Sequence, residues 1–221
     1  MSYLTPQLFY SSLLSIIFLI PLNLQAAITD ITRIYKQTPK LAAFGICTGG
    51  GCAEIKQTSL ADYEWKTITA IFETSNQSTD TTDAQLERKH IAEAIGALEK
   101  MVGAKTATST DRAGTFNNSE YPGQLDCNDE AINSTTYMRL MHQHGLIKLH
   151  QIEDMRTRSF FLFGWPHSAA SIREIATGER YAVDSWFYDN GFPATIIPLS
   201  LWKSGYFPSD SPIVSKRSAE K

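Results

Sequence analysis

The stretch Gln124-Leu-Asp-Cys-Asn-Asp-Glu-Ala-Ile-Asn-Ser-Thr-Thr-Tyr-Met138 places one cysteine among acids and amides at the predicted start of a helix. Asp126 is a typical N-cap residue, and a glycine, Gly145, stands where a helix from about Cys127 to Gln143 would end. The inward positions of this helix would be Ala131, Tyr137, Leu140 and Met141. The polar surroundings of the cysteine are unlike those of a purely structural buried thiol, which raises the question of whether it is reactive.

Cys127 falls in the first turn of this helix, where unpaired backbone N–H groups and the positive end of the helix dipole favour a thiolate. The neighbouring acids Asp129 and Glu130 act against the thiolate, because their charge has the same sign. A cysteine nucleophile needs a base, and His142 and His144 lie at the far end of the helix, roughly 20 Å away at 1.5 Å per residue. His150 lies within a strand candidate, whereas His167 opens the segment "HSAASIREI" after a Gly-Trp-Pro sequence. His167 is therefore the preferred base.

Two segments that follow, residues 167–175 and 180–187, predict a β-hairpin. A short turn places a residue two or four positions from His167 opposite Asp184, so both side chains project from one face of the sheet. The remaining offset along the strands is roughly 7 to 13 Å, which a bulge or strong twist would shorten. The alternative is that Asp184 is a structural carboxylate at a strand end.

The N-terminal segment predicts export. Residues 8–24 are mostly apolar, the first charged side chain is Asp30, and "LQAA" after Pro21 is typical of a signal peptide cleaved near Ala27. No basic residue precedes Arg33, so an uncleaved anchor in the inner membrane is the alternative. In either case we expect the domain to lie outside the cytosol, periplasmic or secreted.

Export also decides how the other two cysteines are interpreted. Cys47 and Cys52 in "CTGGGC" are close enough to form a disulfide in an oxidising compartment. A redox-active pair or half of a metal site are the alternatives, but the spacing is not Cys-x-x-Cys and no second cysteine pair is present. We expect a structural disulfide, a free Cys127 and no metal.

The rest of the chain predicts one α+β domain. Residues 83–103 predict a helix with an apolar stripe, ended by Gly103, on which His90 is expected at the surface. Residues 60–72 suggest a strand or a short helix, and residues 105–123 a long loop. We expect residues 28–221 to form one domain, with an N-terminal subregion at 28–105 and a catalytic core at 120–208.

Composition excludes some classes of protein. The 221 residues have a net charge of −3, which offers no basic surface for nucleic acid. The glycines at 49–51 are not followed by Gly-Lys-Ser/Thr, so no phosphate loop is predicted. We expect no cofactor, and membrane contact only if the N-terminal segment is uncleaved.

The order of a helix-opening Cys127, "PHSAA" around His167 and "YAVDSWF" around Asp184 resembles the transglutaminase-like branch of the papain-fold superfamily, including bacterial transglutaminase-like cysteine proteinases. The resemblance covers roughly residues 120 to 190. It implies that the helix packs on an antiparallel sheet, that the cysteine attacks an amide or ester carbonyl, that the histidine transfers protons and that the aspartate orients it. Asn128 stands where true transglutaminases often have an aromatic residue, which favours amide hydrolysis over cross-linking.

Together these features predict an exported cysteine peptidase or related amide hydrolase that forms a thioester and acts on peptides or proteins. The backbone N–H of Cys127 would stabilise the oxyanion, with Gln124 as a second donor. Gln124 is equally well interpreted as a loop residue without a role. The tryptophans at 165, 186 and 202 would line a cleft or pack in the core. The alternative functions are a cell-wall peptide amide hydrolase and a non-catalytic binding module that retains the fold.

Overall fold

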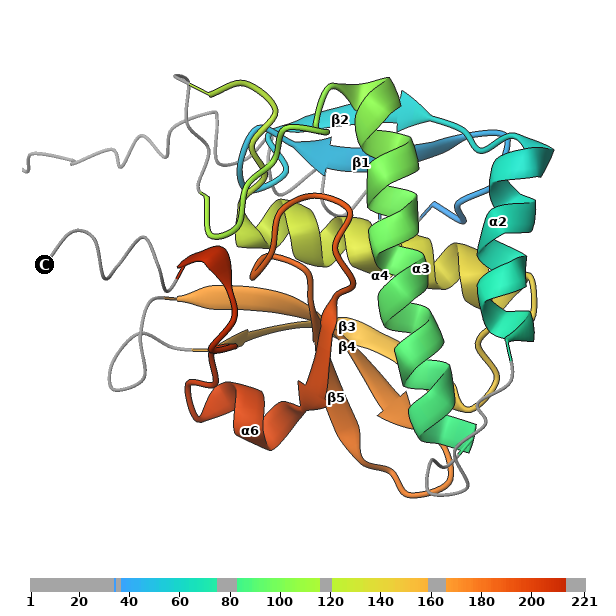
Figure 1. Ribbon diagram of the computed structural model, residues 1–221, viewed down its shortest axis with the longest axis vertical. Helices are drawn as coiled ribbons and strands as arrows, with labels where there is room; N and C mark the ends of the chain where they lie inside the picture. Colours follow the sequence, from blue (N-terminus) through green and yellow to red (C-terminus); the bar gives the residue numbers. More distant parts are fainter. Residues whose placement is uncertain (1–33, 35–36, 75–82, 116–120, 159–165, 214–221) are drawn as a thin grey trace, which may run out of the picture.

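The structure is a computed structural model that describes residues 34, 37–74, 83–115, 121–158 and 166–213. It combines helices with antiparallel sheets, so the fold is α+β as the sequence predicts (Figure 1). In chain order the elements are β1 (Phe44–Thr48), β2 (Glu54–Thr58), α2 (Asp62–Glu73), α3 (Asp83–Thr106), α4 (Cys127–Gln143), β3 (His150–Arg158), β4 (His167–Glu174), β5 (Arg180–Asp184), β6 (Thr195–Pro198) and α6 (Leu199–Lys203).

Helix α4 is the central element. It lies between the β1–β2 hairpin and the four-stranded sheet (Figure 1), and most of its residues are buried. The Asp126 side chain caps its N-terminus by accepting from the backbone N–H groups of Asn128 and Asp129, at 3.0 and 2.9 Å. At the other end Gly145 has a φ of 70°, a conformation that glycine adopts without strain. The predicted bounds of this helix are confirmed.

The sheet has the antiparallel order β3-β4-β5-β6. Ala170 lies opposite Val183, so Asp184 falls opposite Ala169, two residues from His167. Side chains alternate between the faces of a strand, and His167 and Asp184 therefore share one face. This is one of the two registers that the sequence allowed. The shift in register lies between β3 and β4, near Glu153, and no shift is found along the β4–β5 ladder.

Most of the apolar core is one cluster that α3, α4 and the sheet build together. The predicted stripe of α3 contributes Ile91, Ile95, Leu98 and Val102, all fully buried. The prediction that Gly103 ends this helix was wrong, since α3 continues to Thr106. A Cβ at Gly103 would lie 3.1 Å from Asn190 and Ser109 atoms, so this glycine permits a close approach of two loops.

The expected surface position of His90 was also wrong. His90 is 5% exposed because the end of α2 covers it: its Nε2 lies 3.2 Å from Thr74 Oγ1 and its ring lies 5.4 Å from that of Phe72. The segment at residues 60–72, interpreted as a strand or a helix, forms helix α2. A tertiary contact between two helices, which no local pattern shows, decides the burial of His90.

Residues 1–27, the predicted signal peptide or anchor, lie outside the described residues. Within the described part of the chain, no helix has the length and apolar character needed to cross a bilayer.

Candidate active site

Cys127 begins α4, and its thiol is free. Burial raises the pKa of this thiol to about 11; the Ser168 backbone N–H, which bonds the sulfur, acts against that rise, and the charges of Asp126 and Asp184 add to it. The resting thiol is therefore neutral at physiological pH, although it lies at a helix N-terminus. Cys127 is 6% exposed and shares an apolar cluster with Ala113, Ala169, Ala182, Trp186, Phe187, Leu199, Trp202 and Ile213.

The acids beside Cys127 have structural partners. Cys47 and Cys52 form the predicted disulfide, and their loop lies on the first turns of α4. Asp129 accepts from the Cys52 backbone N–H at 2.7 Å and from that of Gly50 at 2.8 Å, and Asp126 accepts from the Gly51 N–H at 2.7 Å. The polar residues around Cys127 therefore hold the disulfide loop, while the thiol itself lies among apolar side chains.

His167 and Asp184 form a buried pair. The Nε2 atom of His167 donates to Asp184 Oδ2 at 2.6 Å, and Trp202 Nε1 donates to the same oxygen at 2.7 Å. His167 opens β4 and Asp184 ends β5, so the two side chains span the diagonal between neighbouring strands without a bulge. Within the described residues, His167 Nδ1 and Asp184 Oδ1 are buried without a hydrogen-bond partner.

Three aromatic rings surround the imidazole of His167. The ring centroids of Trp186, Phe187 and Trp202 lie 4.6, 5.5 and 5.6 Å from that of His167. The tryptophans at 186 and 202 are thus part of the site and of a packed cluster, while the third tryptophan of the prediction, Trp165, lies outside the described residues. These rings restrict imidazole rotation and keep water from the His167–Asp184 bond.

The structure brings the three predicted catalytic residues to one place. The Cys127 sulfur bonds the backbone N–H of Ser168, which directly follows His167. The rings around His167 also belong to the apolar cluster that contains Cys127. His167 therefore uses Nε2 for an aspartate and leaves Nδ1 without a partner among the described residues. The hydrogen bond between thiol and imidazole that nucleophilic catalysis uses is not formed in this structure.

Gln124 bonds the loop in front of α4. Its Nε2 donates to the Thr110 carbonyl at 2.9 Å, and its Oε1 accepts from the Arg112 backbone N–H at 3.1 Å. These bonds join two parts of the loop and give Gln124 a structural role. Its role as an oxyanion donor stays a prediction.

Sequence reasoning missed Arg158, the last residue of β3. Arg158 pairs with His167 in the β3–β4 ladder, and it is buried, with 8% exposed. Its Nη1 donates to the carbonyls of Trp202 and Tyr206, both at 2.9 Å. Antiparallel pairing of the strand that contains His150 with the strand that His167 opens would have placed Arg158 opposite His167, and this was the signal that could have identified Arg158.

A group of buried carboxyl groups next to the site was also missed. Burial is the first cause that raises the pKa of each: Glu99 to about 7, Asp111 to about 9, and Glu130 well above its usual value. Ser185, which follows Asp184, donates to Glu130. Glu99 falls on the apolar stripe of its helix, and that position was a signal for burial.

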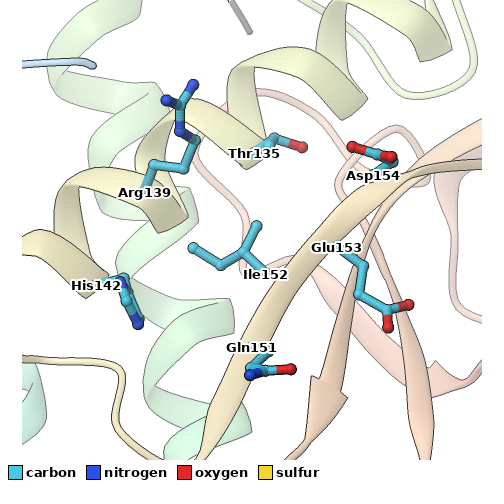
Figure 2. A pocket seen from close by; sticks show the side chains of 7 residues that line it. All are labelled: Thr135, Arg139, His142, Gln151, Ile152, Glu153 and Asp154. Atoms are coloured by element: carbon cyan, nitrogen blue, oxygen red, sulfur yellow. The ribbon is translucent and has the colours of Figure 1, made fainter. Parts of the chain in front are cut away.

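A hollow of about 500 Å³ lies between α4 and β3 (Figure 2). The three predicted catalytic residues are not among the residues that line it. Its polar lining includes Arg139, His142 and Glu153. Over the described ranges of the chain, no group of three or more His, Cys, Asp or Glu side chains is arranged as a metal site.

Comparison of this chain with family models, with curated proteins and with solved structures gave no match.

Proposed function

We propose that this protein is an exported thiol hydrolase that cleaves amide bonds of peptides or proteins through Cys127, His167 and Asp184. The observation that carries the proposal is the buried His167–Asp184 pair, in which His167 Nδ1 lacks a partner among the described residues. A free thiol, that of Cys127, belongs to the aromatic cluster around this imidazole. The proposed core is of the transglutaminase-like type. It is supported by a cysteine-bearing helix packed on an antiparallel sheet that carries the histidine and aspartate on neighbouring strands.

The first half of the reaction forms a thioester. His167 Nδ1 takes the thiol proton as Cys127 Sγ attacks the carbonyl carbon, and the carbonyl oxygen becomes an oxyanion. Backbone N–H groups at the start of α4, including that of Cys127, stabilise this charge. The tetrahedral intermediate then expels the amine, which takes the proton from His167 Nδ1. Asp184 stabilises the transient imidazolium through its bond to Nε2.

The second half releases the acid. Water attacks the thioester while His167 Nδ1 accepts its proton, and the carboxylic acid leaves as the thiol of Cys127 is restored. A neutral resting thiol suits this sequence, because His167 acts as a general base rather than as the partner of a preformed thiolate. The disulfide between Cys47 and Cys52 supports the exported location, since oxidising compartments preserve such bonds.

One observation favours a non-catalytic module instead. Cys127 is 6% exposed and the pKa of its thiol is raised to about 11, so the site as described is closed and its nucleophile is protonated. The catalytic proposal requires that substrate reaches the thiol when the aromatic cluster opens.

The test exploits the cysteine content. The chain has three cysteines and two form the disulfide, so any iodoacetamide adduct seen by intact-mass spectrometry at neutral pH reports on Cys127. The enzyme should label, hydrolyse amide substrates and lose turnover completely as Cys127→Ala. Muropeptides assayed beside protein-derived peptides separate a cell-wall enzyme from a peptidase. A native protein that neither labels nor hydrolyses either substrate class rejects the hydrolase proposal in favour of the non-catalytic module.

A further inference from the structure

Arg158 is a buried cation that the steps above do not use. It ends β3, lies beside His167 in the sheet and is 8% exposed. Removing a guanidinium from water costs several kcal/mol unless charges and hydrogen bonds inside the protein compensate. A buried arginine at this position therefore requires a physical reason.

The neighbours of Arg158 fix its position but do not neutralise it. Nη1 bonds two backbone carbonyls, those of Trp202 and Tyr206. The guanidinium carbon lies 4.9 Å from the ring centroid of Trp202 and 5.9 Å from that of Phe187, both within cation–π range. Nε is buried without a hydrogen-bond partner among the described residues. Dipoles and rings hold the group, and its full positive charge remains.

The negative groups that interact with Arg158 belong to the candidate site. Burial lowers the pKa of Arg158, and the charges of Asp184 and Cys127 act in the opposite direction. The Trp202 ring beneath the guanidinium donates its Nε1–H to Asp184. Asp126 is the other negative group facing the thiol. Ionised Cys127 therefore faces two carboxylates. The Trp202 and Phe187 rings against which Arg158 lies share one apolar cluster with Cys127, and Trp202 bonds Asp184, so these rings connect the guanidinium to the thiol and to the carboxylate.

We propose that Arg158 is a positioning residue that holds a fixed positive charge against Asp184 and the ionised form of Cys127. It does not touch the substrate. Through Trp202 it also keeps the indole N–H aimed at Asp184. This inference rests on the proposed function for its biological meaning, but its effect on the thiol can be measured without a substrate.

The experiment compares second-order rates of Cys127 alkylation by iodoacetamide at pH 8, on folded full-length protein. Arg158→Gln removes the charge, Arg158→Lys keeps it, and Arg112→Gln removes an exposed arginine whose Nη1 pairs with Asp189 at 2.9 Å. The thiolate is the reacting form, and one unit of pKa changes its amount tenfold. We expect Arg158→Gln to react at least about tenfold more slowly, Arg158→Lys within about threefold of the unmodified protein, and Arg112→Gln at the unmodified rate.

Two results overturn the proposal. Arg158→Gln reacting at the unmodified rate or faster means that the residue only packs, since loosened packing exposes the thiol. Arg158→Lys reacting as slowly as Arg158→Gln means that the bonds to the two carbonyls matter and the charge does not. Thermal unfolding of each variant establishes that it is folded. If Arg158→Gln is unfolded, Arg158→Lys decides instead: a folded Arg158→Lys protein whose alkylation is about tenfold slower contradicts the proposal.

The outcomes also separate this inference from the proposed function. If alkylation follows the expected order but no amide is hydrolysed, Arg158 tunes a thiol with another role. If Cys127→Ala abolishes hydrolysis while the Arg158 variants alkylate normally, the hydrolase stands and the role of Arg158 is rejected.

Discussion

Two buried histidine–carboxylate pairs in this protein have opposite characters. His150 is fully buried, with Nδ1 2.8 Å from Glu87 Oε1 and Nε2 3.0 Å from Arg88 Nη1. A guanidinium only donates, so His150 Nε2 accepts from Arg88 and Nδ1 donates to Glu87. Glu87 also accepts from the backbone N–H groups of Lys148 and Leu149, at 2.8 and 2.9 Å.

Both ring nitrogens of His150 therefore have hydrogen-bond partners, whereas the His167–Asp184 pair contains polar atoms without one. His167 bonds Asp184 through Nε2, but within the described residues His167 Nδ1 and Asp184 Oδ1 have no partner. A pair whose polar atoms are all hydrogen-bonded stabilises the fold, whereas a buried polar atom without a partner destabilises it. A purely structural pair is therefore expected to be fully bonded. This difference is why we propose catalysis at His167–Asp184 and a structural role for His150–Glu87.

The strongest test of this difference is Asp184→Asn. Asparagine keeps the shape but favours the wrong imidazole tautomer, so we expect turnover to fall by about 10⁴-fold with folding nearly intact. Turnover and thermal unfolding are to be measured on the same samples. A destabilised variant with unchanged activity per folded molecule would make Asp184 structural.

Glu87→Gln is the matched change in the other pair. Its amide NH₂ would face groups that donate to the carboxylate, and we expect a loss of about 3 kcal/mol in the free energy of unfolding. Turnover per folded molecule should not change. Chemical denaturation monitored by circular dichroism measures the loss, and a drop in specific activity would show that the two pairs are coupled.

Reduction of the disulfide should weaken the side of the molecule that carries Cys127. For a ring this small we expect the free energy of unfolding to fall by about 2 kcal/mol. Hydrogen exchange should rise at the backbone amides of Gly51 and Cys52, whose acceptors are the N-cap residue and a first-turn residue of α4, and not at Lys148 and Leu149. Equal changes at both places would contradict a local effect.

The smallest expected effect concerns pH. The pKa values of Glu99 and Asp111 are raised in the folded state, to about 7 and about 9, so the folded protein binds more protons than the unfolded chain. The stability that these carboxyl groups contribute is present below their unfolded pKa and is lost as pH rises through about 7 to 9. Glu87 has the opposite sign: burial raises its pKa, but the bonds from His150 and two backbone amides outweigh this and hold it low.

Glu130→Gln tests this cluster, because it removes one of its titrating carboxyl groups and retains an acceptor for Ser185. We expect the fall in stability between about pH 6 and 9 to shrink by about 1 kcal/mol, or roughly 3 °C in Tm. Differential scanning calorimetry across this range measures it. A variant whose Tm falls as steeply as that of the unmodified protein would remove Glu130 from the cluster.

Local patterns in the sequence were sufficient for the elements of the candidate site. Asp126 and Gly145 bound α4 because capping bonds and positive φ are properties of one or two residues. Strand alternation placed His167 and Asp184 on one face, because that period holds for any β-hairpin. The Cys47–Cys52 disulfide followed from a short glycine-rich spacing.

Only the tertiary structure decided which charged groups are buried and what they face. The environment of Arg158 depends on a strand register and on Trp202, 44 residues away along the chain. The burial of His90, the bonds of Glu87 and the acidic neighbours of Glu130 depend on the way α3 packs against other elements. Burial and electrostatic interactions are set by distances in space, whereas caps, turns and alternation are set by distances along the chain. The sequence alone could therefore propose Cys127, His167 and Asp184, and the fold was needed to reveal that burial raises the pKa of Cys127 and that Arg158 is a buried cation paired with His167 in the sheet.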